Sequence, residues 1–219
     1  MSASTLLASL AERLAPPHTA LLVVDMQNDF CARDGYVETV LGKDAAPCRA
    51  VVVPIKALVE RARAARVPVL WVRADYHPDK APAHLALKAH ERGNKLPFCH
   101  AGTWGAEFFE LRPGSGEPVI DKHCFSAFIG TGLEQRLRGA GVRTVVLAGV
   151  QTNACIDSSM RDAASLGFHV VVAADCVASH TPELHEATLK NAAFLFGDVV
   201  PSAEIARIWN AARPLGEAA

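Results

Sequence analysis

The sequence lacks three features, each of which would point to a particular class of protein. Its six cysteines form no C-x-x-C pair, so the spacing signal of a zinc ribbon or a thioredoxin-type site is missing. No apolar run approaches the roughly 20 residues that a membrane-spanning helix needs. Lysine and arginine together number 22 and aspartate and glutamate 23, so no excess charge favours a nucleic acid or an anionic membrane as partner.

Two further absences concern the cellular compartment. Residues 1–18 have no basic region and only a short, interrupted apolar stretch, which argues against a signal peptide. Six cysteines are also few for a disulfide scaffold in a chain of 219 residues. We therefore expect a cytoplasmic protein whose thiols are mostly reduced.

The composition and the hydrophobic pattern predict one α/β domain over residues 1–219. Half of the residues are hydrophobic and 21% are charged, which is typical of a folded globular chain. Short apolar runs alternate with helical patterns, as in a parallel sheet covered by helices on both faces. We expect a three-layer, Rossmann-like sandwich with a mainly parallel six-stranded sheet. The expected strands are 20–24, 67–72, 118–120, 143–148, 169–174 and 198–200, and the expected helices are 47–65, 131–140, 155–167, 183–194 and 202–212.

Polar residues follow most of the predicted strands. In open α/β sheets, ligands bind beyond the carboxyl ends of the strands, so the functional residues are expected there: Asp25, Asp75, Lys122, Gly149 to Cys155, and Asp175. The longest irregular stretch, 74–103, is expected to form a lid or a pocket wall, because such long connections are usually functional.

Cys155 stands at a strand-to-helix turn and opens a predicted helix. The positive end of the helix dipole favours a thiolate there, and free backbone N–H groups can hold an oxyanion. Asp25 is expected to accept the thiol proton and later pass it to a leaving amine. Lys122 is expected to keep Asp25 ionised and to favour the thiolate. The ordinary alternatives are a buried structural cysteine, a capping aspartate and a surface lysine.

Three segments resemble the signature segments of the isochorismatase-like cysteine hydrolase superfamily. They are VVDMQNDF (23–30), DKHCFSAF (121–128) and LAGVQTNACIDSSMRDAASLGF (147–168). The resemblance covers roughly residues 18–200. It implies a family fold in which the catalytic aspartate, lysine and cysteine fall on Asp25, Lys122 and Cys155.

The resemblance also implies a non-proline cis peptide between Val150 and Gln151. This turn would aim the N–H groups of Gln151 and Cys155 at the substrate oxygen. Isochorismatases that cleave a vinyl ether lack the nucleophilic cysteine, so its presence implies amide hydrolysis through a thioester.

The expected site contains no metal and no other cofactor. Nicotinamidases of this superfamily bind a metal through a D-x-H motif and two further histidines. Asp75, His77 and His84 resemble part of that set, but the spacing is one residue longer, and His100 follows Cys99 where the family has a histidine before the cysteine. A metal-assisted nicotinamidase is therefore the alternative, as is a small-ligand-binding member of the fold without catalysis.

The segments 25–38 and 121–142 resemble the branch that cleaves ureido and carbamoyl compounds, which implies a small-molecule amide as substrate. The family commonly forms homodimers or homotetramers, and the segment 204–216 either contributes to such an interface or packs on its own sheet. The residues expected to line the substrate pocket are Gln27, Asn28, Phe30, Tyr36, His77, Trp104 and Phe125, with Gln151 beside them.

Overall fold

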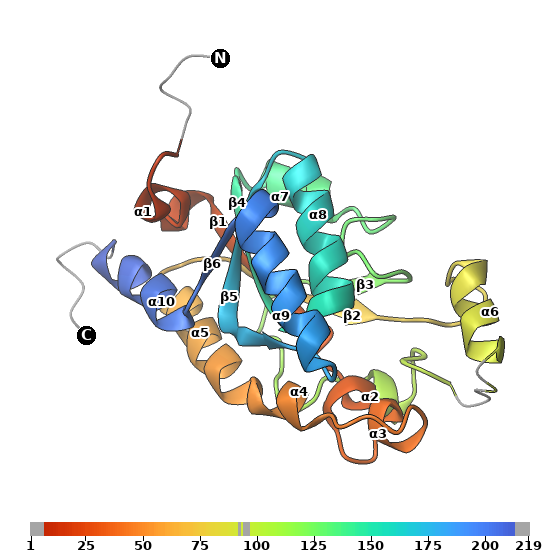
Figure 1. The fold of residues 1–219 in the computed structure, drawn as a ribbon. Coiled ribbons are helices and arrows are strands. Elements are labelled where there is room, and N and C mark those ends of the chain that lie inside the picture. Colours follow the sequence, from red (N-terminus) through yellow and green to blue (C-terminus); the bar gives the residue numbers. More distant parts are fainter. Residues whose placement is uncertain (1–6, 92, 94–96, 213–219) are drawn as a thin grey trace.

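Six parallel strands form the centre of the molecule. The structure is a computed structural model that describes residues 7–91, 93 and 97–212. The strand order is β3-β2-β1-β4-β5-β6, with every neighbouring pair parallel (Figure 1). The strands are β1 (Thr19–Val24), β2 (Val69–Ala74), β3 (Val119–Lys122), β4 (Thr144–Val150), β5 (His169–Ala178) and β6 (Asp198–Val200). The predicted fold class is confirmed, and β5 extends four residues beyond its predicted end.

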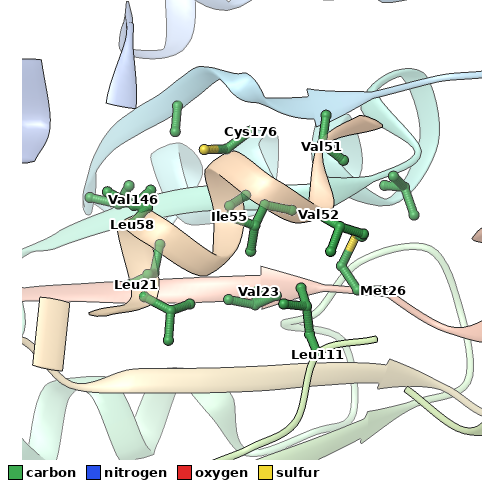
Figure 2. Close-up of a cluster of buried hydrophobic side chains, with 14 of the residues drawn as sticks. Leu21, Val23, Met26, Val51, Val52, Ile55, Leu58, Leu111, Val146 and Cys176 are labelled. Atoms are coloured by element: carbon green, nitrogen blue, oxygen red, sulfur yellow. The ribbon is translucent and has the colours of Figure 1, made fainter. Parts of the chain in front are cut away.

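Helices cover both faces of this sheet. The helices α5 (Val52–Ala64) and α10 (Ser202–Ala211) lie on one face, and α7 (Leu133–Gly139), α8 (Asp157–Ser165) and α9 (Pro182–Asn191) on the other (Figure 1). The side chains of β1 alternate between the two layers, as the pleat of a strand requires. Leu21 and Val23 pack beneath Ile55 and Leu58 of α5 (Figure 2), whereas Leu22 packs in the opposite layer.

Several shorter elements were not predicted. The expected helix 47–65 is divided at Val51, and the stretch 74–103 contains a helix, because the Ala- and Leu-rich segment after Pro82 has high helix propensity. The remaining helical elements are α1 (Leu10–Arg13), η2 (Pro16–His18), α2 (Asn28–Cys31), α3 (Tyr36–Thr39), α4 (Ala46–Ala50), α6 (Ala83–Glu91), η3 (Trp104–Ala106), η4 (Thr152–Ile156) and η5 (Ala192–Phe196).

The helix α10 packs on its own sheet. Ile205 and Trp209 are fully buried, and the indole N–H of Trp209 donates to the carbonyl oxygen of Leu14 at 3.0 Å. The described part of the segment 204–216 thus follows the second alternative, while residues 213–216 lie outside the described residues. The homodimer or homotetramer stays a prediction. None of the helices in the described ranges combines the length and hydropathy needed to cross a membrane.

The strand order places the topological switch point of the sheet between β1 and β4. The chain adds β2 and β3 on one side of β1 and then β4, β5 and β6 on the other. In doubly wound sheets the two connections diverge at this point, and a crevice opens beyond the carboxyl ends of the two central strands. The residues that follow Val24 and Val150 therefore lie at the position where such folds bind ligands.

Candidate active site

Asp25 is the first residue after β1 and is held in an uncommon backbone conformation. Its φ is +54°, in the left-handed region that non-glycine residues rarely adopt. Its backbone N–H donates to the carbonyl oxygen of Val72 at 2.9 Å, and its side chain is fully buried. Two residues on, the Gln27 side chain is bonded to the backbone of Ala74 and Ala106. These bonds anchor the turn that directs the Asp25 carboxylate into the interior.

Lys122 ends β3 and carries a buried ammonium group. Its Nζ lies 2.8 Å from Asp25 Oδ2 and 3.3 Å from Cys155 Sγ, and both side chains of the ion pair are completely inaccessible. Nζ also donates to the carbonyl oxygen of Cys124 at 3.0 Å and to the Tyr76 hydroxyl at 3.1 Å. A buried lysine stays charged only when it is paired and hydrogen-bonded, and these contacts satisfy that requirement.

Cys155 lies in η4, a π-helical turn between β4 and α8. The residue is 2% exposed, and the peptide bond between Val150 and Gln151 is cis, as expected from the resemblance. Sγ contacts the Lys122 ammonium and lies 3.6 Å from the Tyr76 hydroxyl. A carboxylate, an ammonium and a thiol from three distant segments therefore meet at one place, as the sequence predicted.

Burial dominates the electrostatics of the site. It raises the pKa of Cys155 to about 12, the charge of Asp25 adds to this effect, and Lys122 opposes it. Burial also raises the pKa of Asp25 above its ordinary value, although the charge of Lys122 acts in the other direction. For Lys122, burial alone would lower the pKa, but Asp25 and Cys155 raise it instead. The site thus favours the charged form of Lys122 and the protonated form of the Cys155 thiol.

The surroundings of Cys155 run against the expectation of a thiolate favoured by the helix dipole and by Lys122, because burial raises the pKa of the thiol. The thiol lies in the π-turn before α8 rather than in the first turn of an α-helix. It is desolvated and beside an anion, and these effects outweigh the nearby cation. A base must therefore take the proton as the sulfur attacks. Neither carboxylate oxygen of Asp25 receives a well-aligned hydrogen bond within the described part of the chain, so this carboxylate is available.

Several residues expected at the substrate are committed elsewhere. The two amide hydrogens of Gln27 bind backbone carbonyls, which leaves it an anchoring role rather than a substrate donor. The Asn28 amide donates to the carbonyl oxygen of Trp104 at 2.7 Å. The Gln151 side chain donates to Cys48 Sγ and accepts from the His180 N–H. The oxyanion role expected of the Gln151 and Cys155 backbone stays a prediction.

The aromatic candidates divide into two groups. Tyr36 and Trp104 line a cavity of about 270 Å³. The Phe98 ring lies 4.5 Å from that of Tyr36 and 5.6 Å from that of Tyr76, whose hydroxyl reaches the thiol. Phe30 packs edge-on against the same Phe98 ring at 5.0 Å. Phe30, Tyr36 and Tyr76 thus all contact the Phe98 ring, and Tyr76 connects this aromatic cluster to Cys155 Sγ.

Phe125 and His77 lie toward the surface. Phe125 is 38% exposed and faces the His84 ring of α6 at a centroid distance of 6.4 Å. The His77 ring is 5.2 Å from that of His100 and has a 44% exposed side chain. Both belong to the segments that border α6, and their expected contact with substrate stays a prediction.

The residues around Asp75 do not fit a metal ion. The Asp75 carboxylate accepts from Lys80 Nζ at 2.7 Å and from the backbone N–H of Ala101 at 3.1 Å, so both oxygens are occupied. Burial opposes ionisation, but these bonds lower the pKa of Asp75, and Lys80 supplies the positive charge that a metal would bring. Across residues 7–91, 93 and 97–212, no three His, Cys, Asp or Glu side chains are grouped to hold an ion.

Tyr76 is the site residue that the sequence analysis missed. It directly follows Asp75 beyond β2, and its hydroxyl reaches both Lys122 and Cys155. The sequence feature that could have identified Tyr76 is its position. A phenol at the carboxyl end of a strand that neighbours β1 lies next to Asp25.

Gly149 allows β1 and β4 to approach each other beside the site. Its φ is +120°, and a Cβ there would overlap the backbone of Val24. We expect Gly149→Ala to lower the free energy of unfolding by about 2–4 kcal/mol, because the two strands must separate or the backbone must distort. Chemical denaturation measures this. Gly139→Ala is the control, since a Cβ there meets nothing within 4 Å and α7 tolerates alanine. Equal stability of the two variants would contradict the prediction.

The fold and the site define an α/β protein with a buried cysteine, lysine and aspartate at the switch point of the sheet. Residues 19–204 match the isochorismatase domain, and the chain belongs to this family. It is similar to the ureidoacrylate amidohydrolase RutB of Agrobacterium fabrum, at 31% identity over 92% of this chain and 94% of that protein. The resemblance predicted from the motifs is thereby confirmed.

Solved structures agree with this assignment. A cysteine hydrolase from Pseudomonas syringae pv. phaseolicola superposes with a TM-score of 0.80 at 26% identity, covering 90% of this chain and 95% of that one. The N-carbamoylsarcosine amidase of Thermoplasma acidophilum superposes with a TM-score of 0.68 at 27% identity, covering 84% and 96%. These relatives are named as hydrolases and amidases, the enzyme class that the motifs predicted.

Proposed function

We propose that this protein hydrolyses a small ureido or carbamoyl amide through a thioester on Cys155. The observation that carries the proposal is the shared ammonium of Lys122, which lies 2.8 Å from Asp25 and 3.3 Å from Cys155. The names of the relatives, ureidoacrylate amidohydrolase and N-carbamoylsarcosine amidase, support the substrate class.

The first half of the reaction forms the thioester. Asp25 takes the thiol proton while Cys155 Sγ attacks the carbonyl carbon, which gives a tetrahedral intermediate with a negative oxygen. The backbone N–H groups of Gln151 and Cys155 are proposed to hold this oxygen. Asp25 then passes the proton to the nitrogen, the C–N bond breaks, and ammonia or an amine leaves.

The second half restores the enzyme. Asp25 takes a proton from water as the water oxygen attacks the thioester carbon. The C–S bond breaks when this intermediate collapses, and the proton on Asp25 returns to the Cys155 sulfur. Lys122 remains charged throughout and balances the charge of Asp25 when the carboxylate is ionised. Asp25 thus carries each proton, which agrees with a carboxylate whose pKa is raised by burial.

An ammonia-release screen tests the proposal. Ureido acids, carbamoyl amines and nicotinamide are offered to the protein, with and without a metal chelator. We expect turnover of a ureido or carbamoyl compound at a rate unchanged by the chelator, because Lys80 already occupies the Asp75 carboxylate. Turnover of nicotinamide that is lost with chelator and restored by zinc would favour the nicotinamidase alternative. Binding without turnover of any compound would favour the non-catalytic one.

A further inference from the structure

Tyr76 contacts two members of the proposed catalytic group through one oxygen atom. Its hydroxyl lies 3.1 Å from Lys122 Nζ and 3.6 Å from Cys155 Sγ. The same ammonium lies 5.2 Å from the centre of the Tyr76 ring, within cation–π range. The Phe98 ring also packs against this ring, at a centroid distance of 5.6 Å. Lys122 and Phe98 therefore both contact the phenol, and its oxygen lies within reach of the sulfur.

The number of N–H donors on Lys122 shows why the contact between the Tyr76 hydroxyl and Cys155 Sγ matters. A lysine ammonium has three N–H donors, yet four acceptors surround it: Asp25 Oδ2, the Cys124 carbonyl oxygen, the Tyr76 hydroxyl oxygen and Cys155 Sγ. The three oxygens lie at 2.8–3.1 Å and the sulfur lies farther away at 3.3 Å. The sulfur can receive only one of these hydrogens, and the three oxygens compete for them, so a second donor to the sulfur would strengthen its hydrogen bonding.

The Tyr76 hydroxyl can be that donor. Its oxygen accepts from Lys122, which leaves its own hydrogen free to point at Cys155 Sγ. Burial raises the pKa of the phenol well above its ordinary value, and the neighbouring Cys155, Asp25 and Cys99 raise it further. The phenol thus keeps its proton while the sulfur becomes an anion.

We propose that Tyr76 is a fourth catalytic residue, whose hydroxyl donates a hydrogen bond to the Cys155 sulfur as this becomes a thiolate. The inference rests on the proposed function and adds a hydrogen-bond donor to its catalytic groups. The hydrogen stays on the phenol oxygen throughout, so Asp25 remains the group that receives the thiol proton. The hydrogen bond stabilises the anionic sulfur during attack and again when the thioester releases it. Burial and the charge of Asp25 raise the pKa of Cys155 and so favour the protonated thiol. Tyr76 and Lys122 act in the opposite direction and lower this pKa.

The variant Tyr76→Phe removes the hydroxyl and keeps the ring. We expect kcat to fall by about 10- to 100-fold with KM nearly unchanged, as for the loss of one hydrogen bond to a charged group. Alkylation of Cys155 by iodoacetamide, followed on the peptide that contains it, should slow by about tenfold at each neutral to mildly alkaline pH. Only the thiolate reacts, and its fraction falls when the pKa of Cys155 rises. An unchanged melting temperature confirms that the variant folds.

The control is Ser165→Ala, which removes an exposed hydroxyl at the far end of α8, away from the site. Its alkylation profile should equal that of the wild type. An unchanged Cys155 alkylation rate in Tyr76→Phe overturns the inference, even if KM rises, since a rise in KM alone indicates a contact with substrate. Alkylation needs no substrate, so this result is independent of the proposed function, which fails separately if Cys155→Ala keeps its activity.

Discussion

Replacing Cys155 by alanine is expected to abolish amide hydrolysis while leaving the fold intact. Without the sulfur no thioester forms, and the rate should fall by roughly four to six orders of magnitude, as when the nucleophile of a hydrolase is removed. The side chain is small and lies in a turn rather than in a strand, so the melting temperature should change by only a few degrees. Ammonia release and thermal unfolding measure the two quantities.

Cys176→Ala is the matched control for this variant. Cys176 is also fully buried and burial raises its pKa to about 12, but it lies in β5, within the core cluster that packs around α5 (Figure 2). The control should lose some stability and keep its activity per folded molecule. Activity retained by Cys155→Ala would exclude the covalent route. In the wild type, a mass increase confined to the Cys155 peptide after rapid quenching would identify the acyl intermediate.

The variant Asp25→Asn is expected to lose both activity and stability. The amide cannot accept the thiol proton, and the rate should fall by roughly three orders of magnitude or more. The ammonium of Lys122 also loses the carboxylate 2.8 Å away while remaining fully buried. Breaking a buried ion pair from one side typically costs about 3–5 kcal/mol, because an uncompensated charge is left inside. Ammonia release and denaturant unfolding check the two losses.

The double variant Asp25→Asn with Lys122→Met separates the two effects. Removing both charges should recover much of the stability and none of the activity, since a buried pair replaced by uncharged groups is often neutral in free energy. If the double variant is no more stable than Asp25→Asn alone, the two residues are not coupled as an ion pair. If Asp25→Asn retains activity, another group is the base.

The pH dependence of stability gives a second readout of this pair. The pKa of Lys122 is raised above its ordinary value of 10.5 in the folded protein. Its contribution to stability is therefore fully present below that pH and is lost as the pH rises through the folded-state pKa. The wild type should lose stability in this alkaline range, whereas the double variant should show a flatter profile. Equal alkaline slopes would contradict the assignment.

The sequence determined where the chemistry is concentrated. Runs such as ALLVV and VVLA are apolar and rich in valine, so they are expected to form strands buried on both faces, as strands of parallel sheets are. Parallel strands present their carboxyl ends at one edge of the sheet. Asp25, Lys122 and Cys155 could therefore be placed at the same edge from the sequence, before any contact between them was known. The strands follow from the hydrophobic pattern of each segment, and the shared edge follows from the geometry of a parallel sheet.

The tertiary structure alone decided the state of each group at that edge. The protonation of Cys155 depends on desolvation and on the balance between Asp25 and Lys122, which come from segments far apart in the chain. The metal-like motif at Asp75 is occupied by Lys80, and Tyr76 reaches the sulfur only because β2 lies beside β1. The burial and the direction of a side chain depend on neighbours from several segments of the chain. They therefore cannot be predicted from the residue pattern of one segment.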